Sequence, residues 1–326
     1  MKILFHENEL NYRGTSIALY DYADFNERYL GNESLIVYNK NLPTNHELGI
    51  EKFSKRFKVF GYSDFKEVDQ LINQNNIDLF YAIKNGDIDT IETKECKTVI
   101  HSVFKHFEPH GDVYAYVSQW LSQEMTGSKY PFVPHMVNFE NGTDQDLRKE
   151  LNIPVNAKVF GYYGGHASFN IIFAQQTIEN IASKYKDIYF IFMGVDSFVK
   201  KKWWKSALSN IIFLPPSSDI IIKQKFINTC SALLHARERG ETFGITVAEF
   251  AIKGKPVIAF ANPPEKAHIS HLEDKAYYYR DHKELRDIIL DADLSISAEE
   301  LFQKFLPHPV MDTFKQVFID NKCSVS

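Results

Sequence analysis

Short apolar runs that alternate with longer amphipathic stretches are the feature of this 326-residue sequence that most restricts its fold. The runs are apolar at nearly every position rather than at every second one, as expected for strands buried on both faces of a parallel sheet. One series of runs ends before residue 120, and a second begins near residue 158. The alternation therefore predicts an α/β protein with two Rossmann-like, doubly wound domains, each built on a parallel sheet.

The expected elements divide into the same two series. The predicted strands are 2–5, 35–38, 57–60, 78–82, 97–100 and 113–117, then 158–162, 187–193, 210–214, 231–235, 256–260 and 276–279. The predicted helices are 15–29, 64–75, 118–127, 170–184, 219–229, 243–253 and 282–290. The final stretch, 297–322, is expected to form one or two helices interrupted near Pro307 and Pro309, since proline breaks a helix.

A polar stretch over 138–157 separates the two series and contains Pro154. We therefore expect an N-terminal Rossmann-like domain over 1–140 and a second Rossmann-like domain over 141–296. A C-terminal helical segment, 297–326, is expected to return to the first domain. Open parallel sheets bind ligands beyond the carboxyl ends of their strands, so two such domains that face each other would form a cleft there.

Composition excludes several classes of protein. The sequence has 37 Lys and Arg residues and 42 Asp and Glu residues, which gives a net charge of −5. This charge argues against a protein that binds along the phosphates of a nucleic acid, because such proteins usually have a basic excess. No apolar run approaches the roughly 20 residues that span a bilayer. The sequence has three cysteines, Cys96, Cys230 and Cys323. Their odd number and wide spacing argue against a disulfide framework or a CxxC metal site. The N-terminus does not have the pattern of a signal peptide, so the expected location is cytoplasmic.

The stretch 233–260, LLHARERGETFGITVAEFAIKGKPVIAF, carries the strongest functional signal. It predicts a strand, a charged loop, a helix over Thr242–Lys253 and another strand. Glu249 lies within this helix, which is apolar on nearly every side, and a buried carboxylate is costly unless it is paired or hydrogen-bonded. The two hydroxyls of a ribose would satisfy it. Glu241 lies eight residues earlier, about 12 Å along a helix axis, so the two carboxylates would contact different parts of one extended ligand.

The start of this helix is a candidate phosphate site. Free N–H groups around Phe243 and Gly244 would face the phosphates, and Arg237 and Arg239 would add positive charge. Simpler interpretations remain open at this point. Glu241 alone is as well explained as a residue that stabilises the helix N-terminus, and Glu249 as an i,i+4 partner of Lys253.

Three parts of this stretch form one pattern: Glu241-Thr-Phe243-Gly244, Glu249 and Gly254-Lys-Pro256-Val257-Ile258. The pattern resembles the signature of the retaining glycosyltransferases of family 4. These are group 1 glycosyltransferases of GT-B architecture, and this chain resembles a divergent branch of them. The resemblance implies that Glu249 holds the ribose of the donor nucleotide. It also implies that Glu241 contacts the transferred sugar near its 3- and 4-hydroxyls. Thr242 and Thr246 of the same stretch are assigned to the donor site.

The resemblance is weaker in the first domain. Gly14 follows the first predicted strand and opens a helix, where the family has glycine near the phosphates and the acceptor; a plain strand-to-helix turn is the alternative. His101 ends the strand 97–100, where the family often places a histidine beneath the sugar. The resemblance implies a catalytic role for His101, and the alternative is a core or surface histidine bonded to the backbone.

The start of the second domain departs from the family pattern. The family has Arg and Lys there to clamp the diphosphate, but no Arg or Lys lies between Lys158 and Lys184. Gly164 and Gly165 precede a helix, and their backbone N–H groups could cradle a phosphate. The positive charge would then come from elsewhere, with Arg237, Arg239, Arg13 and Lys266 as candidates.

Three other patterns are set aside as chance or structural. Asp87-Ile-Asp89 and Asp291-Ala-Asp293 lack the context of a metal-binding Asp-x-Asp, and His101, His106 and His110 lack supporting carboxylates. No metal site is therefore predicted. The cationic aromatic segment 198–205 is better explained by a helix that packs on the sheet than by peripheral contact with anionic lipid at the inner face of a membrane.

The sequence thus predicts a metal-independent hexosyltransferase that needs no cofactor beyond its donor, a UDP- or GDP-hexose. The acceptor would be a hydroxyl of a glycan or a lipid-linked sugar, and the family resemblance implies retention of configuration. The alternative is a catalytically degenerate GT-B scaffold that binds a nucleotide or glycan without transfer. Among other GT-B enzymes, the spacing of Glu241 and Glu249 argues against an epimerase, and the chain length argues against a phosphorylase.

Overall fold

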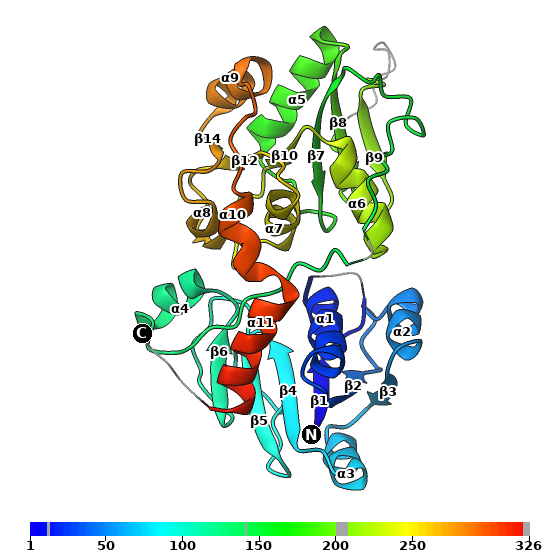
Figure 1. The fold of residues 1–326 in the computed structure, drawn as a ribbon, viewed down its shortest axis with the longest axis vertical. Coiled ribbons are helices and arrows are strands. Elements are labelled where there is room, and N and C mark those ends of the chain that lie inside the picture. The colour runs from blue at the N-terminus through cyan, green and yellow to red at the C-terminus, as the bar shows by residue number, and fades with distance from the viewer. Residues whose placement is uncertain (12–13, 141, 200–207, 322–326) are drawn as a thin grey trace. The chain divides into compact units, whose positions relative to one another are not determined.

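A computed structural model describes residues 1–11, 14–140, 142–199 and 208–321 of the chain. These residues form two compact units. Unit 1 comprises Met1–Asn138 and Lys304–Ser326, and unit 2 comprises Phe139–Gln303. In the described part of each unit, six parallel strands form one sheet with helices on its faces (Figure 1). The predicted class, two doubly wound α/β units, is confirmed.

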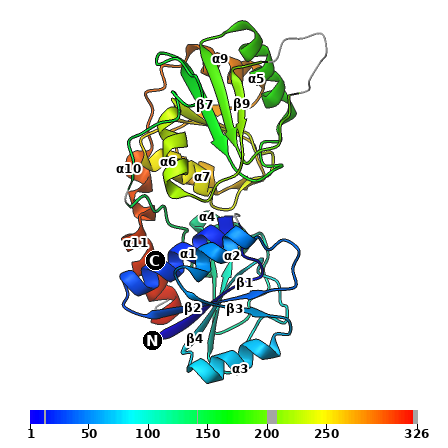
Figure 2. The same cartoon turned by 90° about the vertical axis from the view of Figure 1, so that its right-hand side faces the viewer.

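Unit 1 has the strand order β3-β2-β1-β4-β5-β6. Its strands are β1 (Lys2–Glu7), β2 (Glu33–Asn39), β3 (Lys58–Tyr62), β4 (Leu79–Lys84), β5 (Lys97–Ser102) and β6 (Val113–Tyr116). Its helices are α1 (Gly14–Arg28), α2 (Glu47–Ser54), α3 (Lys66–Asn75), α4 (Gln119–Thr126), α11 (Pro307–Phe314) and the π-helix η2 (Lys315–Ile319). Figure 2 shows α1 and α2 on one side of the strands and α3 on the other. All six residues of β4 are buried, which explains its unbroken apolar run.

The C-terminal segment completes the core of unit 1. Its helix α11 begins with Pro307 in the first turn, where a missing N–H costs nothing. The Phe314 ring lies 5.4 Å from that of Tyr81 and 5.5 Å from that of Tyr22. The Lys97 ammonium donates to the carbonyls of Phe318 and Ile319 at 2.6 and 3.0 Å. Chain ends that are far apart in the sequence therefore share one hydrophobic core.

Unit 2 has the strand order β14-β12-β10-β7-β8-β9. Its strands are β7 (Lys158–Tyr163), β8 (Ile188–Met193), β9 (Ile211–Leu214), β10 (Ala232–His235), β12 (Val257–Phe260) and β14 (Tyr277–Tyr279), with a separate short pair, β11 (Gly240–Glu241) and β13 (Glu265–Lys266). Its helices are α5 (Ile172–Lys184), α6 (Ile220–Thr229), α7 (Ile245–Ile252), α8 (Ala267–Leu272), α9 (His282–Asp291) and α10 (Glu299–Phe302). The 3-10 helix η1 (Gln303–Phe305) begins at the last residue of unit 2. The chain runs outward from β7 to β9 and then returns to β10 on the other side of β7.

Some local predictions differ from the structure. The helix predicted from Thr242 begins at Ile245, because Gly244 has φ 94° and ψ 62°, which no helical turn contains. The short pair β11/β13 and the helices α2 and α8 were not predicted, since each has too few residues to show a period. The cationic aromatic segment 198–205 lies mostly in 200–207, outside the described residues. Among the helices that are described, none has both the length and the apolar character to cross a membrane.

The aromatic contacts of Phe314 predict a strong effect of truncation. Phe314→Ala should lower the free energy of unfolding by about 3–5 kcal/mol, because the cavity lies among buried rings. Gln316→Ala changes an exposed residue two positions along the same segment, and its effect should stay within about 0.5 kcal/mol. Urea unfolding of both variants measures the difference. A loss of stability in Phe314→Ala as small as that in Gln316→Ala would show that the Phe314 ring contributes little packing energy.

Candidate functional site

The carboxyl ends of β7 and β10 define the candidate site in unit 2. The chain reverses its direction of travel across the sheet between these two strands, and ligands of open α/β sheets bind at such a switch point. Gly164 and Gly165 follow β7, and His235 ends β10. The two strands pair directly, with Leu233 opposite Gly161. The sheet therefore brings the glycine loop and the charged loop of 236–241 to one edge.

Glu241 is held by two donors. His235 Nε2 lies 3.2 Å from its Oε1, and Arg237 Nη1 donates to its Oε2 at 2.7 Å. Burial alone would raise the pKa of Glu241. The hydrogen bond from His235 and the charge of Arg237 outweigh burial and hold the pKa below its ordinary value of 4.5. The side chain remains 17% exposed. Glu241 is therefore an anion with a fixed orientation that a ligand can still reach.

A second histidine, His268, lies next to His235. The rings of His235 and His268 are 4.6 Å apart, and both side chains are buried. Burial, with a smaller effect of the neighbouring His235, holds the pKa of His268 well below 6.5. Its ring is therefore neutral at neutral pH. Within the described residues, neither ring nitrogen of His268 has a hydrogen-bond partner.

The charged loop is fixed by the short pair β11/β13. Gly240 pairs with Glu265, and Glu241 with Lys266. Arg239 Nε donates to the buried Glu265 Oε1 at 2.8 Å. Gly240 has φ 78°, and a Cβ there would lie 1.9 Å from the carbonyl oxygen of Glu265. Only glycine fits, and the backbone of Glu241 is positioned by this close approach.

Helix α7 begins directly after this loop, at Ile245. Gly244 precedes it, and no side chain among the described residues caps this end. A Cβ on Gly244 would approach the Cβ of His268 to 3.0 Å. Thr246 Oγ1 donates to the carbonyl of Tyr163, the last residue of β7, at 3.0 Å. The first turn of α7 is thus tied to the strand that leads into Gly164 and Gly165.

Glu249, in the second turn of α7, is buried but paired. The Lys223 ammonium of α6 donates to its Oε1, and the Tyr163 hydroxyl donates to its Oε2. Lys223 and Glu249 each have only 5% of the side chain exposed. The structure pairs the Glu249 carboxylate with Lys223 and not with the alternative partner, Lys253. The Lys253 ammonium instead lies 5.4 Å from the centre of the Phe139 ring.

The glycine loop has one constrained and one open position. A Cβ on Gly164 would lie 2.4 Å from Ser168 Oγ, whereas a Cβ on Gly165 would meet nothing within 4 Å. Ser168 closes the turn by donating from its backbone N–H and its hydroxyl to the Gly165 carbonyl, at 3.0 and 2.6 Å. Gly165 therefore leaves open space beside the end of β7.

Two predicted site residues belong to unit 1. His101 is fully buried, with Nδ1 2.6 Å from the Tyr81 hydroxyl and Nε2 2.9 Å from the Val133 carbonyl. Burial lowers its pKa to about 3. This environment fits the alternative left open by the sequence, a core histidine bonded to the backbone, and both ring nitrogens are engaged. The catalytic role of His101 stays a prediction. Gly14 is exposed and is the first residue of α1.

Unit 2 therefore brings together most of the predicted donor residues. The predicted donor residues that follow β7 or β10 along the chain are Gly164, Gly165, Arg237, Arg239, Glu241, Thr242, Phe243, Gly244, Thr246 and Glu249. Three further residues were not predicted: Lys223, His235 and His268. A polar residue at the end of the apolar strand 231–235 was a signal for His235. Lys223 carried no signal, because its partner lies 26 positions away.

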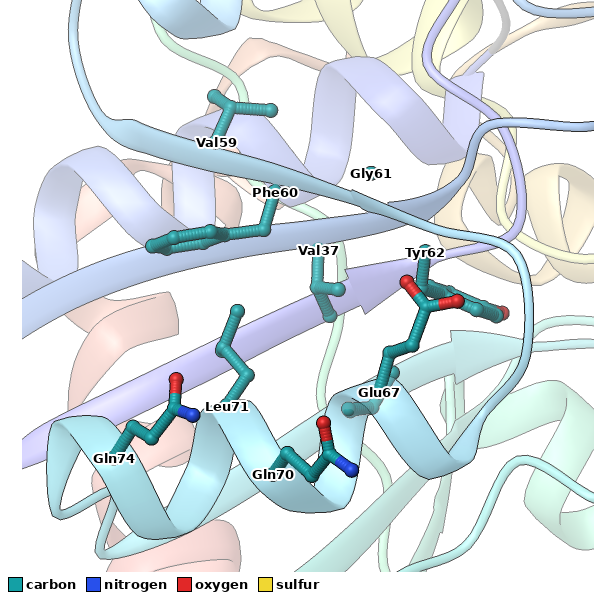
Figure 3. Close-up of a pocket in the computed structure, with 10 residues that line it drawn as sticks. Val37, Val59, Phe60, Gly61, Tyr62, Glu67, Gln70, Leu71 and Gln74 are labelled. Atoms are coloured by element: carbon teal, nitrogen blue, oxygen red, sulfur yellow. The ribbon is translucent and has the colours of Figure 1, made fainter.

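A pocket of about 410 Å³ lies elsewhere, in unit 1 (Figure 3). Residues of β2, β3 and α3 line it, among them Val37, Phe60 and Leu71. Glu67 and Gln70 of α3 also lie along it, as Figure 3 shows. None of its lining residues is a predicted site residue. The pocket is a groove between α3 and the edge strand and not part of the candidate site.

Comparisons with known proteins identify the fold. No family model and no curated protein matches the sequence. Among solved structures, Anabaena HepE in complex with UDP-glucose aligns with a TM-score of 0.71 at 15% identity over 97% of this chain and 99% of that chain. A glycosyltransferase from Rickettsia africae aligns with a TM-score of 0.71 at 14% identity over 99% of both chains. A Listeria monocytogenes protein whose proposed activity is that of a UDP-N-acetylglucosamine 2-epimerase reaches 0.60 at 11% identity, over 98% and 97%. The chain therefore has the GT-B fold, as its motif predicted.

The close approach at Gly240 predicts a selective loss of stability. Gly240→Ala should lower the free energy of unfolding by more than about 1–2 kcal/mol, because it adds a clash to the cost of a left-handed backbone. Gly165→Ala is the matched control and should change the stability by less than about 0.5 kcal/mol. Urea unfolding compares the two. Similar values for both variants would contradict the positioning role of Gly240.

The environment of Glu241 predicts the direction of a pKa change. Arg237→Gln removes a positive charge that lowers the pKa of Glu241, so burial is less opposed and this pKa should rise. Arg239→Gln, which changes the neighbouring arginine bound to Glu265, should leave it nearly unchanged. NMR titration of ¹³C-glutamate protein, with Glu241 assigned through Glu241→Gln, measures both. A fall in the Arg237→Gln variant would refute the electrostatic assignment.

Proposed function

We propose that the chain is a glycosyltransferase that moves a hexose from a nucleotide-diphosphate sugar to a hydroxyl of a glycan or lipid-linked acceptor. The observation that carries this proposal is the pair of carboxylates around the uncapped start of α7. Glu241 is anionic and partly exposed before the helix, and Glu249 is buried in its second turn. Between them lies a helix N-terminus suited to phosphate.

The donor would bind along this line. The diphosphate would accept hydrogen bonds from N–H groups at the start of α7 and from the loop at Gly164 and Gly165. The ribose hydroxyls would donate to Glu249, and the hydroxyls of the hexose would donate to Glu241. An anionic carboxylate accepts such bonds more strongly than a neutral acid, so the low pKa of Glu241 suits this task.

In the transfer step, the bond between the anomeric carbon and the diphosphate oxygen breaks, and a bond to the acceptor oxygen forms. The acceptor proton passes to the departing diphosphate. Attack from the face that the diphosphate leaves gives retention of configuration. Backbone N–H groups and Arg237 would stabilise the charge that develops on the leaving group, so the proposal assigns this task to the protein and not to a metal ion.

The solved structures support a uridine donor. HepE was solved with UDP, with UDP and glucose, and with UDP-glucose. UDP-hexose is accordingly the first donor to test, with GDP-hexose second. The presence of an epimerase among proteins of the same fold does not alter the proposal, because it rests on the Glu241 and Glu249 arrangement rather than on the fold.

A scaffold that binds without transfer is the second candidate. One observation favours it: Arg237 and Arg239, the nearest candidates to replace the family's diphosphate clamp, each donate to a carboxylate of the protein. Their charge toward a phosphate is thereby partly neutralised. Such a protein would bind the nucleotide but release no sugar.

Nucleotide binding and transfer can be tested separately. UDP at 100 times its dissociation constant should stabilise the wild type by about 2.7 kcal/mol, seen as a rise in Tm, and Glu249→Ala should abolish the rise. Glu241→Ala should keep UDP binding but lose sugar transfer from UDP-glucose, followed as release of UDP. Glu238→Ala, an exposed carboxylate of the same loop, is the control. UDP binding without release of UDP from UDP-glucose in the wild type, with any acceptor or water, would favour the scaffold.

A further inference from the structure

A buried polar cluster surrounds Glu249, and the proposed function gives no role to its other two members, Lys223 and Tyr163. The three residues come from three elements: Lys223 from α6, Tyr163 from the end of β7 and Glu249 from α7. All three are nearly excluded from solvent, with 5% of the Lys223 and Glu249 side chains exposed and 7% of Tyr163. A buried ion pair is seldom more stabilising than apolar residues of the same volume. Its presence here therefore calls for a role besides stability.

The cluster fixes the Glu249 carboxylate at both oxygens. Lys223 donates to Oε1 and the Tyr163 hydroxyl to Oε2. The Tyr163 ring is itself held between aromatic neighbours, 5.6 Å from Phe226 and 5.9 Å from Phe250. The Lys223 ammonium also lies 5.3 Å from the centre of the Tyr163 ring. The plane of the carboxylate is thus set from the protein side.

Acceptor capacity remains on the carboxylate. An ionised carboxylate has about four lone-pair sites, and within the described part of the chain Lys223 and Tyr163 fill one on each oxygen. One site on each oxygen is left, which matches two adjacent hydroxyl donors.

The position of the cluster indicates which hydroxyls it would receive. Thr246 and Glu249 are three residues apart on α7 and so share a face, about 4.5 Å apart along the axis. Thr246 belongs to the first turn, where the phosphates are proposed to bind, and it is bonded to the Tyr163 carbonyl. In a nucleoside diphosphate, the sugar that follows the phosphates is the ribose.

We propose that Lys223 and Tyr163 are positioning residues that hold Glu249 for a 2′,3′-diol, and that this buried cluster selects ribonucleotides over 2′-deoxyribonucleotides. This inference rests on the proposed function, since it presupposes a nucleotide on α7. To that function it adds a preference for ribonucleotides and two positioning residues, Lys223 and Tyr163. Removing the 2′-hydroxyl leaves one lone pair of a buried carboxylate without a donor, which disfavours the deoxynucleotide.

The test compares the affinities of UDP and 2′-deoxy-UDP by isothermal titration calorimetry. Wild type should prefer UDP by at least about tenfold. Lys223→Met should bring the ratio close to one, and Tyr163→Phe, which removes one hydroxyl, should reduce it part of the way. Lys225→Met is the matched control on the same helix and should keep the wild-type ratio. Circular dichroism verifies the fold of each variant, and Tyr163→Phe decides the matter if Lys223→Met does not fold.

Each outcome separates the two proposals. A folded Lys223→Met or Tyr163→Phe variant with the wild-type ratio overturns the positioning role but leaves nucleotide binding intact. A wild type that binds UDP and 2′-deoxy-UDP equally well does the same. If the wild type binds neither UDP nor GDP, both the inference and the proposed function fail. If Lys225→Met lowers the preference for UDP as much as Lys223→Met does, the effect comes from the loss of any positive charge on α6. That result overturns the positioning role of Lys223.

Discussion

The direct pairing of β7 with β10 is the constraint on which the candidate site depends. Parallel strands place their carboxyl ends at one edge, and the reversal of chain direction at this pair leaves the edge open to a ligand. Tyr163 and the glycine loop come from β7, and His235 and the charged loop come from β10. Residues about 70 positions apart in sequence, such as Asn170 and Glu238, are then joined by a hydrogen bond. The pairing also brings Tyr163, at the end of β7, to Glu249, on the helix that follows β10.

The two carboxylates are stabilised in different ways, and the difference suits different tasks. Glu241 is partly exposed and held by an imidazole and a guanidinium, so that its charge is available to a ligand at the surface of unit 2. Glu249 is nearly enclosed and held by an ammonium and a phenol. Desolvation makes each bond to Glu249 count for more, since unpaired buried groups are costly. Selectivity is therefore better placed at Glu249, and contact with a larger, variable sugar at Glu241.

Some of this arrangement could be predicted from the sequence and some could not. Apolar runs of strand length predicted the strands because burial on both faces leaves a strong local pattern. The start of α7 was placed three residues early, since Glu241-Thr-Phe243-Gly244 is compatible with a helix and only the left-handed Gly244 excludes it. The catalytic role of His101 was predicted from the family resemblance at the end of a strand. Its partners, Tyr81 and Val133, are distant in sequence and give no local sign.

The sequence by itself determined the two-sheet architecture and the spacing of Glu241 and Glu249, because period, length and motif are local properties of the chain. The tertiary structure alone decided the partners of these carboxylates. Lys223 is one of two lysines in α6, and only the packing of this helix against α7 and β7 makes it, rather than Lys225, the counter-ion of Glu249. The charge and orientation of a buried group depend on the atoms that replace water around it, and these come from distant parts of the sequence.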